Sequence, residues 1–451
     1  MTTKTKKEYL IYKLSDEMKG STRMDAALFK KLDVKRGLRN EDGTGVLVGL
    51  TNIGNVVGYD RKPDGSIEPI EGRLYFRGYE VRDLVHAIMA EKRFGYEEIC
   101  FLLLSGRLPD AEELQSFKDL VYENMPLEQK TILHIIELEG DDIMNILARS
   151  VLEFYTFDEN PDDVSRDNLM RQSIELISKF PATIAYAYNM YRHHHHGRSL
   201  HIRDAQPGLS LAENFLYMLK GADYTPLDAR TLDLLLILHS EHGGGNNSTF
   251  TVRVTSSTGT DTFSSIAAGI GSLKGPKHGG ANLKVSAQLE DFKANIQHWE
   301  NEGEVADYIR KILRKEAGDR SGLVYGMGHA VYTLSDPRAV ILKKKAFQLA
   351  KGKEIEREFL LLDTIERLTP VLMKEERGIE KAVCANVDMY SGLVYRMLEI
   401  PQDLYTPLFA VSRMAGWSAH RMEELMTGGR IIRPAYKALP KKQHYVPITE
   451  R

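Results

Sequence analysis

The sequence predicts a mainly helical protein with short β-hairpins near its N-terminus. After residue 80, apolar side chains recur at helical spacing, and helix-capping motifs precede several of these stretches. Residues 43–80 differ, because they combine β-branched residues, frequent glycine and the turn sequence "KPDGS". The first 40 residues are highly charged and predict a helix with solvated surface.

Capping motifs predict where individual helices begin. "DAEE" at 110–113 and "SLAE" at 210–213 both have the pattern of a capping box before an apolar run. The second of these helices should end at Gly221, and another should begin at Thr225, whose next residue is proline. The segment "LDLLLILHS" that follows is apolar nearly all round, which favours a buried helix.

Later segments continue this pattern, with two stretches of a different kind. "DPR" at 336–338 predicts a helix start, and apolar stripes over 355–372 and 408–425 predict two more helices. "STFTVRVTSST" at 248–258 alternates apolar and polar residues, which taken alone favours a strand. The four-histidine run His193–His196 predicts an exposed polar loop.

Composition excludes several classes of partner. Lys plus Arg number 60 against 63 Asp plus Glu, so the net charge of −3 gives no reason to expect nucleic acid or an anionic membrane. No run approaches the length of a transmembrane helix, and the N-terminal residues lack the apolar core of a signal peptide. The only cysteines, Cys100 and Cys384, are far apart, so we expect no disulfide framework and a cytoplasmic location.

Four segments place acid–base side chains beside glycines. His242 lies in "LHSEHGGGN", His278 in "GPKHGG", His329 in "YGMGHA" and Asp388 in "NVDMYSG". Glycine lets the backbone turn tightly or approach a ligand closely. With Arg338 at a helix start, the set suits proton abstraction beside a carbonyl on an anionic substrate.

A metal site is the competing interpretation of the histidines. His239 and His242 have H-x-x-H spacing, and His193–His196 could add ligands. No cysteine lies nearby and the H-E-x-x-H pattern is missing, so the metal signal is weak. We therefore expect no metal.

Together, these segments resemble the signatures of the citrate synthase family. The resemblance is carried by "LKGPKHGGAN", "GMGHAVYTLSDPR", "NVDMYSG" and "LFAVSRMAGWSAH", in the order and at the separations usual for that family. "EGRLYFRGYEVRDL" and "FLLLSGRLPDAEEL" are similar to its N-terminal half, so the resemblance covers roughly residues 43–437.

The resemblance implies the condensation of acetyl-CoA with oxaloacetate and the hydrolysis of citryl-CoA to citrate and CoA. Asp388 matches the base that removes a proton from the acetyl methyl group. His278 matches the residue that hydrogen-bonds the thioester oxygen, and His329 matches the donor that activates the oxaloacetate carbonyl.

The resemblance also assigns residues that bind the dianion oxaloacetate. His242, Arg338 and Arg413 match residues that hold it, and arginine forks suit carboxylates. Arg433 matches an arginine contributed by the neighbouring subunit, which implies a homodimer. Because side chains of the protein supply the positive charge for both carboxylates of oxaloacetate, the resemblance implies no cofactor. Acetyl-CoA enters as a substrate.

The CoA contacts match the family less closely. Lys381 matches a lysine near the CoA in some relatives, and Gly326 and Gly328 are assigned to the same site. Ala330 and Thr333 stand where bacterial relatives often carry basic residues. A solvated surface position is the alternative for Lys381.

The family fold implies two helical domains, of which the smaller closes over the substrates. The expected boundaries are an N-terminal helical extension at 1–42, a large domain of 43–279 and 399–451, and a small domain at 280–398. The family places helix at 248–258, and this overrides the local strand pattern, because burial can outweigh propensity.

Three other functions stay open at this point. The first is 2-methylcitrate synthase, which uses propionyl-CoA, because a pocket discriminates one methylene by only about 1–3 kcal/mol. The second is a histidine-rich metalloprotein built on His239, His242 and His193–His196. The third is an inactive scaffold that binds CoA, against which the complete acid–base set argues.

Overall fold

The structure is a computed structural model that describes residues 3–451. The chain divides into two compact units, residues 1–50 and 51–451. The first unit contains α1 (Thr3–Ser21), the short α2 (Ala27–Lys31) and the 3-10 turn η1 (Arg36–Leu38). The predicted N-terminal helix is therefore confirmed.

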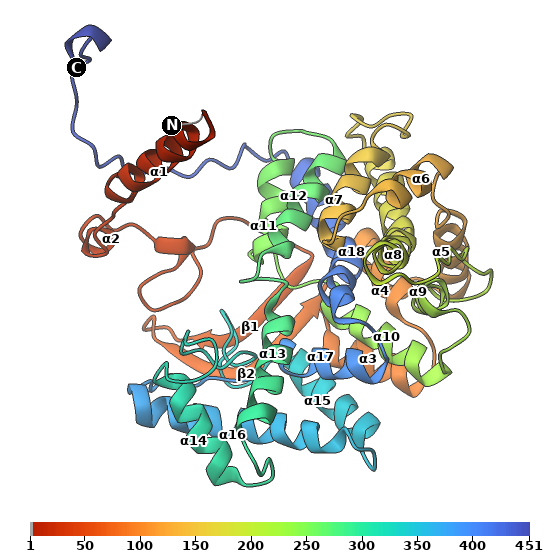
Figure 1. Cartoon of the computed structure of the whole chain (residues 1–451). Helices are drawn as coiled ribbons and strands as arrows, with labels where there is room; N and C mark the ends of the chain where they lie inside the picture. The colour runs from red at the N-terminus through yellow and green to blue at the C-terminus, as the bar shows by residue number, and fades with distance from the viewer. Residues whose placement is uncertain (1–2) are drawn as a thin grey trace. The chain divides into compact units, whose positions relative to one another are not determined.

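The second unit begins with a small antiparallel sheet of order β1-β2-β3 (Figure 1). Its strands are β1 (Gly54–Arg61), β2 (Ile67–Phe76) and β3 (Tyr79–Glu80), and the predicted "KPDGS" turn joins the first two. The register between β1 and β2 shifts at Gly58. The expected hairpin is thus confirmed, with an irregularity where the hairpin packs against a later loop.

Helices make up most of the rest of the second unit. Those before residue 280 are α3 (Val81–Ala90), α4 (Tyr96–Ser105), α5 (Ala111–Glu123), α6 (Gln129–Glu137), α7 (Ile143–Phe154), α8 (Arg166–His196), α9 (Leu211–Lys220), α10 (Pro226–His239), α11 (Asn247–Ser256) and α12 (Thr262–Lys274). Those after it are α13 (Ala281–Asn295), α14 (Glu302–Leu313), α15 (Pro337–Ala350), α16 (Glu356–Arg377), α17 (Asp388–Met397) and α18 (Tyr405–Met426), with the 3-10 turns η2 (Gln402–Leu404) and η3 (Ile448–Glu450).

The helix α18 is the centre of the helices that precede residue 280. It contacts α4, α7, α8, α10, α11 and α12, and Figure 1 shows it among these helices. Residues 405–421 are buried on every face of α18, and Trp417, Arg413 and Arg421 are among the largest fully buried side chains. Helices α13–α17 contact mainly one another and join α18 chiefly through α13.

The predicted helix starts are confirmed by cap geometry. Reciprocal capping boxes form at Asp110 before α5, at Ser210 before α9 and at Thr225 before α10. Asp336 caps α15 by accepting the backbone N–H of Arg338 at 2.9 Å. These local signals worked because each satisfies backbone N–H groups that a helix start leaves unpaired.

The prediction of a polar loop at His193–His196 is wrong. These residues form the last turn of α8, which ends at Gly197 in the left-handed conformation. Within that turn, His194 contacts the carbonyl of Ile136, and His193 contacts the carbonyl of Arg198. The polar cluster is thus the exposed end of a long buried helix, which local composition does not reveal.

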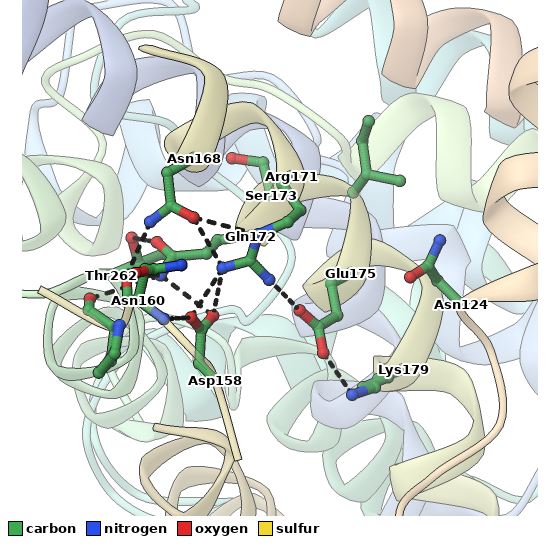
Figure 2. A network of polar contacts seen from close by, with 12 residues as sticks. Asn124, Asp158, Asn160, Asn168, Arg171, Gln172, Ser173, Glu175, Lys179 and Thr262 are labelled. Carbon is green, nitrogen blue, oxygen red and sulfur yellow. Dashed lines mark hydrogen bonds and ion pairs between the residues drawn. The ribbon is translucent and has the colours of Figure 1, made fainter. Parts of the chain in front are cut away.

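A polar network holds the start of the same helix, as Figure 2 shows. Arg171 donates to Asp158 at 2.7 Å and to Asn168 at 2.7 Å. Gln172 accepts a hydrogen bond from Thr262, the first residue of α12. The Asp158 side chain is only 1% exposed, and its ion pair with the 46% exposed Arg171 connects the preceding loop to α8.

Candidate active site

The loops that carry His329 and Asp388 are joined through their backbones. Met327 and Ala385 form an isolated antiparallel bridge. The N–H of Gly328 donates to the carbonyl of Cys384 at 2.8 Å, and the N–H of Asn386 donates to that of Gly326 at 2.9 Å. We call this arrangement the loop bridge. It brings together two segments that are about 60 residues apart in the sequence.

Gly326 is required in the loop bridge for two reasons. Its φ of +84° lies in the left-handed region, which side chains rarely adopt. A Cβ at this position would also lie 2.9 Å from the Met389 sulfur and 3.1 Å from the Met389 Cα. The sequence pattern of glycine before His329 therefore reflects close packing against α17.

His329 has a defined tautomer. Its Nδ1 accepts the backbone N–H groups of Val331 and Tyr332, both at 3.0 Å. In the neutral imidazole the proton must therefore lie on Nε2, which makes that atom a donor. The ring stacks on Tyr332 at 4.6 Å between centroids, and the His242 ring lies edge-on at 5.1 Å.

Asp388 is the first residue of α17 and is half-buried. Its N–H donates to the side-chain oxygen of Asn386 at 3.0 Å, and the Asn386 amide donates to the carbonyl of Gly328 at 2.9 Å. Burial raises the pKa of Asp388 to about 7, although Arg338 opposes this shift. A carboxylate with such a pKa is a stronger base than an ordinary aspartate.

His278 lies in the turn between α12 and α13, as its glycine-rich context predicts. Its Nε2 accepts the backbone N–H of Ser248 at 3.3 Å and lies 3.0 Å from the Ser248 hydroxyl. The Trp417 indole also donates to that hydroxyl, at 3.2 Å. Burial and then Arg413 lower the pKa of His278 to about 4, so the ring is neutral with its proton on Nδ1.

Arg413 is fully buried at the predicted anion site. Its Nε donates to the carbonyl of His239 at 2.7 Å, and its Nη1 donates to the Asn246 side chain at 3.1 Å. Its Nη2 has no hydrogen-bond partner within residues 3–451, and neither do the buried Nε2 of His242 and hydroxyl of Tyr332. Because buried polar atoms are normally paired, this group suits a polar ligand.

Arg338 lies in the first turn of α15 and is only 3% exposed. It donates from Nη2 to Asp336 at 2.7 Å and from Nε to the other carboxylate oxygen at 3.1 Å. Burial alone would lower the pKa of Arg338, but the Asp336 carboxylate outweighs it and raises that pKa. Asp336 thus orients the guanidinium as well as capping the helix, a second role that sequence did not predict.

The remaining predicted residues are two exposed cations and a glycine of the loop bridge. Arg433 is exposed on the irregular segment after α18, where its neighbour Ile432 donates its N–H to Ser257 at 3.1 Å. Lys381 is exposed in the loop between α16 and α17. Gly328 belongs to the loop bridge, with φ of +92°.

Sequence reasoning missed a buried charged network behind His242. Glu241 accepts from His420 Nε2 at 2.9 Å, and His420 Nδ1 accepts from Arg253 at 3.0 Å. Arg253 also pairs with Glu424 at 2.7 Å and with Glu423. His420 holds the pKa of Glu241 below its ordinary value despite burial. His420 lies 167 residues after Arg253, so no local pattern could have identified the network.

Ser248 and Tyr332 were also missed. Ser248 lies in the stretch with strand-like alternation, where nothing in the sequence distinguishes it from its neighbours. Tyr332 lies three residues after His329, and this spacing was the only available signal.

The metal hypothesis receives no support from residue placement. Within 3–451, no three His, Cys, Asp or Glu side chains are grouped so as to hold a metal ion. His239 Nδ1 instead contacts the carbonyl of Leu235 at 2.8 Å, and burial lowers its pKa to about 3. Cys100 and Cys384 are buried free thiols. None of the helices described is long and apolar enough to cross a membrane.

The protein is thus mainly helical, and its buried arginines, histidines and Asp388 form a polar cluster whose unpaired donors suit an anionic ligand. A family model described as "Citrate synthase, C-terminal domain" matches residues 42–435. A citrate synthase of Haloferax volcanii is 34% identical over 93% of this chain and 99% of its own length. Citrate synthase 2 of Bacillus subtilis is 35% identical, covering 85% of this chain and 94% of its own.

Solved structures agree with these sequence matches. The citrate synthase of Thermoplasma acidophilum, in a ternary complex with carboxymethyl coenzyme A and oxaloacetate, has a TM-score of 0.76 at 27% identity. The match covers 92% of this chain and 99% of that one. The citrate synthase of Pyrobaculum aerophilum has a TM-score of 0.73 at 29% identity, with 90% and 94% covered. This chain belongs to the citrate synthase family.

Proposed function

We propose that this protein condenses acetyl-CoA with oxaloacetate and hydrolyses the resulting citryl-CoA to citrate and CoA. The observation that carries the proposal is that His278 and His329 each have one ring nitrogen fixed as an acceptor of backbone N–H groups, together with a carboxylate of raised pKa, Asp388. The pKa is about 7 for Asp388 and about 4 for His278. The chemistry requires this combination, because the base must ionise near neutral pH while the donors stay neutral.

The first step is the formation of the enol of acetyl-CoA. The Asp388 carboxylate removes a proton from the acetyl methyl group, and negative charge develops on the thioester oxygen. His278 donates its Nδ1–H to that oxygen, since its Nε2 is occupied as an acceptor by Ser248. A fixed donor of this kind typically contributes two to three orders of magnitude in rate.

The second step forms the carbon–carbon bond. Oxaloacetate is held by its carboxylates through Arg338, Arg413 and His242, and its ketone accepts the Nε2–H of His329. The enol carbon attacks the polarised carbonyl carbon and the thioester carbonyl re-forms. The ketone oxygen takes a proton through His329, which balances the proton that Asp388 removed, and the product is citryl-CoA. Water then cleaves the thioester, giving citrate and CoA. The buried, unpaired Nη2 of Arg413 and Nε2 of His242 support this arrangement, because both can donate to a carboxylate.

The assembly and the CoA contacts belong to the same proposal. We place Arg433 in the neighbouring subunit's site, so that a homodimer is needed, and its exposed position on an irregular segment is compatible with this role. Lys381 and the glycines of the loop bridge, Gly326 and Gly328, are proposed to contact CoA. We further propose that residues 280–398 close over the substrates as a small domain.

The decisive experiment measures free thiol release by the purified protein. Acetyl-CoA plus oxaloacetate should give rapid release that survives extensive chelation, and propionyl-CoA should react more slowly. Faster reaction with propionyl-CoA would favour 2-methylcitrate synthesis, since one methylene changes selectivity by about 10- to 200-fold. Activity that chelation removes and a divalent metal restores would contradict the metal-free chemistry. No thiol release with either substrate would contradict the proposed reaction and favour an inactive scaffold that only binds CoA.

A further inference from the structure

A small positively charged pocket lies apart from the acid–base groups. Side chains of α3, α10 and α15 and of the turn after α3 enclose about 80 Å³. Apolar side chains such as Val85 and Leu234 form part of the wall. Four cations also line it, namely Lys92, Arg93, Arg230 and Lys345.

Most of this positive charge is not neutralised by the protein. Arg93 pairs with Glu91 and Glu98. The side chains of Lys92, Arg230 and Lys345 make no hydrogen bond or ion pair with any residue in the described part of the chain. The lining therefore holds three cations without an ion-pair partner, of which Lys92 and Arg230 are exposed and Lys345 is buried.

The single carboxylate in the lining does not serve as their counterion. Asp233 accepts the backbone N–H groups of Gly95 at 2.8 Å and of Tyr96 at 3.0 Å. Burial, followed by the nearby Glu97, raises the pKa of Asp233 to about 7. Asp233 therefore caps the start of α4, and it is partly protonated near neutral pH.

Lys345 is the most unusual of the cations, because it is only 9% exposed. Burial and the charge of Arg230 lower its pKa. Buried lysines are normally paired, since an uncompensated charge is costly to bury. Lys345 lies on α15 and Arg230 on α10, so their repulsion opposes the approach of these two side chains at the pocket.

We infer that this pocket is a binding site for a phosphate group, contributed by inorganic phosphate or by a phosphorylated metabolite. One water needs about 10–15 Å³, so the volume of about 80 Å³ admits several waters or one phosphate group. Three acceptor oxygens can receive donors from Lys92, Arg230 and Lys345 at once. A larger metabolite would keep its remaining atoms outside the pocket.

A bound phosphate would link α15 to α10. Lys345 lies seven residues after Arg338 on α15, or about two helical turns. Neutralising the repulsion between Lys345 and Arg230 should therefore stabilise the position of the helix that presents Arg338. We expect a lower KM for oxaloacetate when phosphate is bound. This second consequence rests on the proposed function, whereas binding itself does not.

Calorimetry with inorganic phosphate tests binding without any assay of turnover. Lys345→Gln should weaken phosphate binding about 10- to 100-fold, the effect of losing one charge-assisted hydrogen bond. Lys344→Gln is the matched control, because Lys344 is the adjacent, exposed residue of the same helix. Wild-type affinity in Lys345→Gln, or equal weakening in both variants, would overturn the site.

A second set of titrations distinguishes the two sources of phosphate. Adenosine monophosphate that binds at least tenfold more tightly than phosphate, with the same dependence on Lys345, would identify a nucleotide site. Equal or weaker binding would identify inorganic phosphate. If phosphate binds through Lys345 but the KM for oxaloacetate is unchanged, the link to Arg338 is wrong while the site stands. A protein that binds phosphate but releases no thiol would contradict the proposed function alone.

Discussion

At the residue scale, the imidazoles of His278 and His329, which we propose as catalytic groups, are held as opposite tautomers by backbone N–H groups. His329 accepts such groups at Nδ1, and His278 accepts one at Nε2. Each ring therefore presents its N–H from a different atom, and neither needs a positive charge to act as a donor. The sequence predicts both histidines as site residues. It cannot predict the tautomer of His278, because its partner Ser248 lies 30 positions away in the sequence.

Replacing Asp388 with asparagine tests the proposed base. Asp388→Asn keeps the shape of the side chain but removes its basicity, so turnover should fall about 10²- to 10⁴-fold. Oxaloacetate affinity should change much less, because the arginines bind that substrate. Steady-state kinetics and oxaloacetate titration measure the two effects separately. Asp223→Asn, an exposed position, is the control and should behave as wild type; near-normal turnover in Asp388→Asn would remove the assignment.

The pH dependence follows from the same pKa. Burial raises the pKa of Asp388 to about 7, and the base works only when ionised. The value of kcat/KM for acetyl-CoA should therefore fall about tenfold per pH unit below that pKa. His278, with a pKa of about 4, should not titrate in this range. A profile that is flat from about pH 8 down to pH 5.5 would contradict the raised pKa.

The same shift has a defined sign for stability. The pKa of Asp388 is raised above its value of about 3.8 in the unfolded chain. Its contribution to stability is therefore complete below the unfolded value and is lost as pH rises through about 7. Asp388→Asn should thus be relatively more stable than wild type above neutral pH. Denaturant unfolding at about pH 5 and pH 8 would measure this difference.

At the element scale, the sequence predicts where helices start better than where they end or how they pack. Capping is a local interaction, so the sequence predicts the helix starts at Asp110, Ser210 and Thr225. The alternation in α11 gives the opposite signal, although the segment is helical. Thr249, Val252 and Arg253 are all buried there, since α11 packs between α12 and α18. Tertiary packing thus overrides a two-residue period that local analysis interprets as a strand.

The hairpin positions the loop that orients His329. A Cβ on Gly58 would lie 2.6 Å from the carbonyl oxygen of Val331 and 2.9 Å from the Cα of Tyr332. Gly58→Ala should therefore displace the two N–H donors to His329. We expect a loss of about 1–3 kcal/mol in stability and about 100-fold in turnover, since small displacements of catalytic groups are costly. Denaturant unfolding and kcat measure both.

Gly271→Ala is the matched control for that substitution. Gly271 lies in α12, and a Cβ there would meet no atom within 4 Å. Alanine should be neutral or stabilising by up to about 1 kcal/mol in a helix interior. Full activity in Gly58→Ala would show that the hairpin does not constrain the loop.

At the scale of the whole molecule, sequence predicts the family and the helical class but not the assembly. The chain divides at residue 50 into two compact units, whereas the proposed boundaries at 280 and 398 within the second unit stay a prediction. Arg433 could be assigned to a site only through family resemblance. Its surroundings in the sequence, "IIRPAY", carry no periodic or capping signal that would indicate its role.

Subunit complementation tests the shared site. Arg413→Ala and Arg433→Ala should each weaken oxaloacetate binding, because each removes a charge-assisted carboxylate contact. In mixed dimers, one site would carry both substitutions and the other would be intact. Random exchange should therefore restore activity to about a quarter of the wild-type level, as an isologous dimer requires. Exchange without any recovery would place both arginines in one subunit's site.

The loop bridge has a consequence for hydrogen exchange. Most loop amides exchange quickly, but those of Gly328 and Asn386 are bonded to carbonyls on the opposite loop. They can exchange only when the His329 and Asp388 segments separate. Their protection therefore measures the free energy that separates the two loops in the absence of substrate. The exchange rates of these two amides, which lie outside the helices and strands, thus show whether the two loops are still joined.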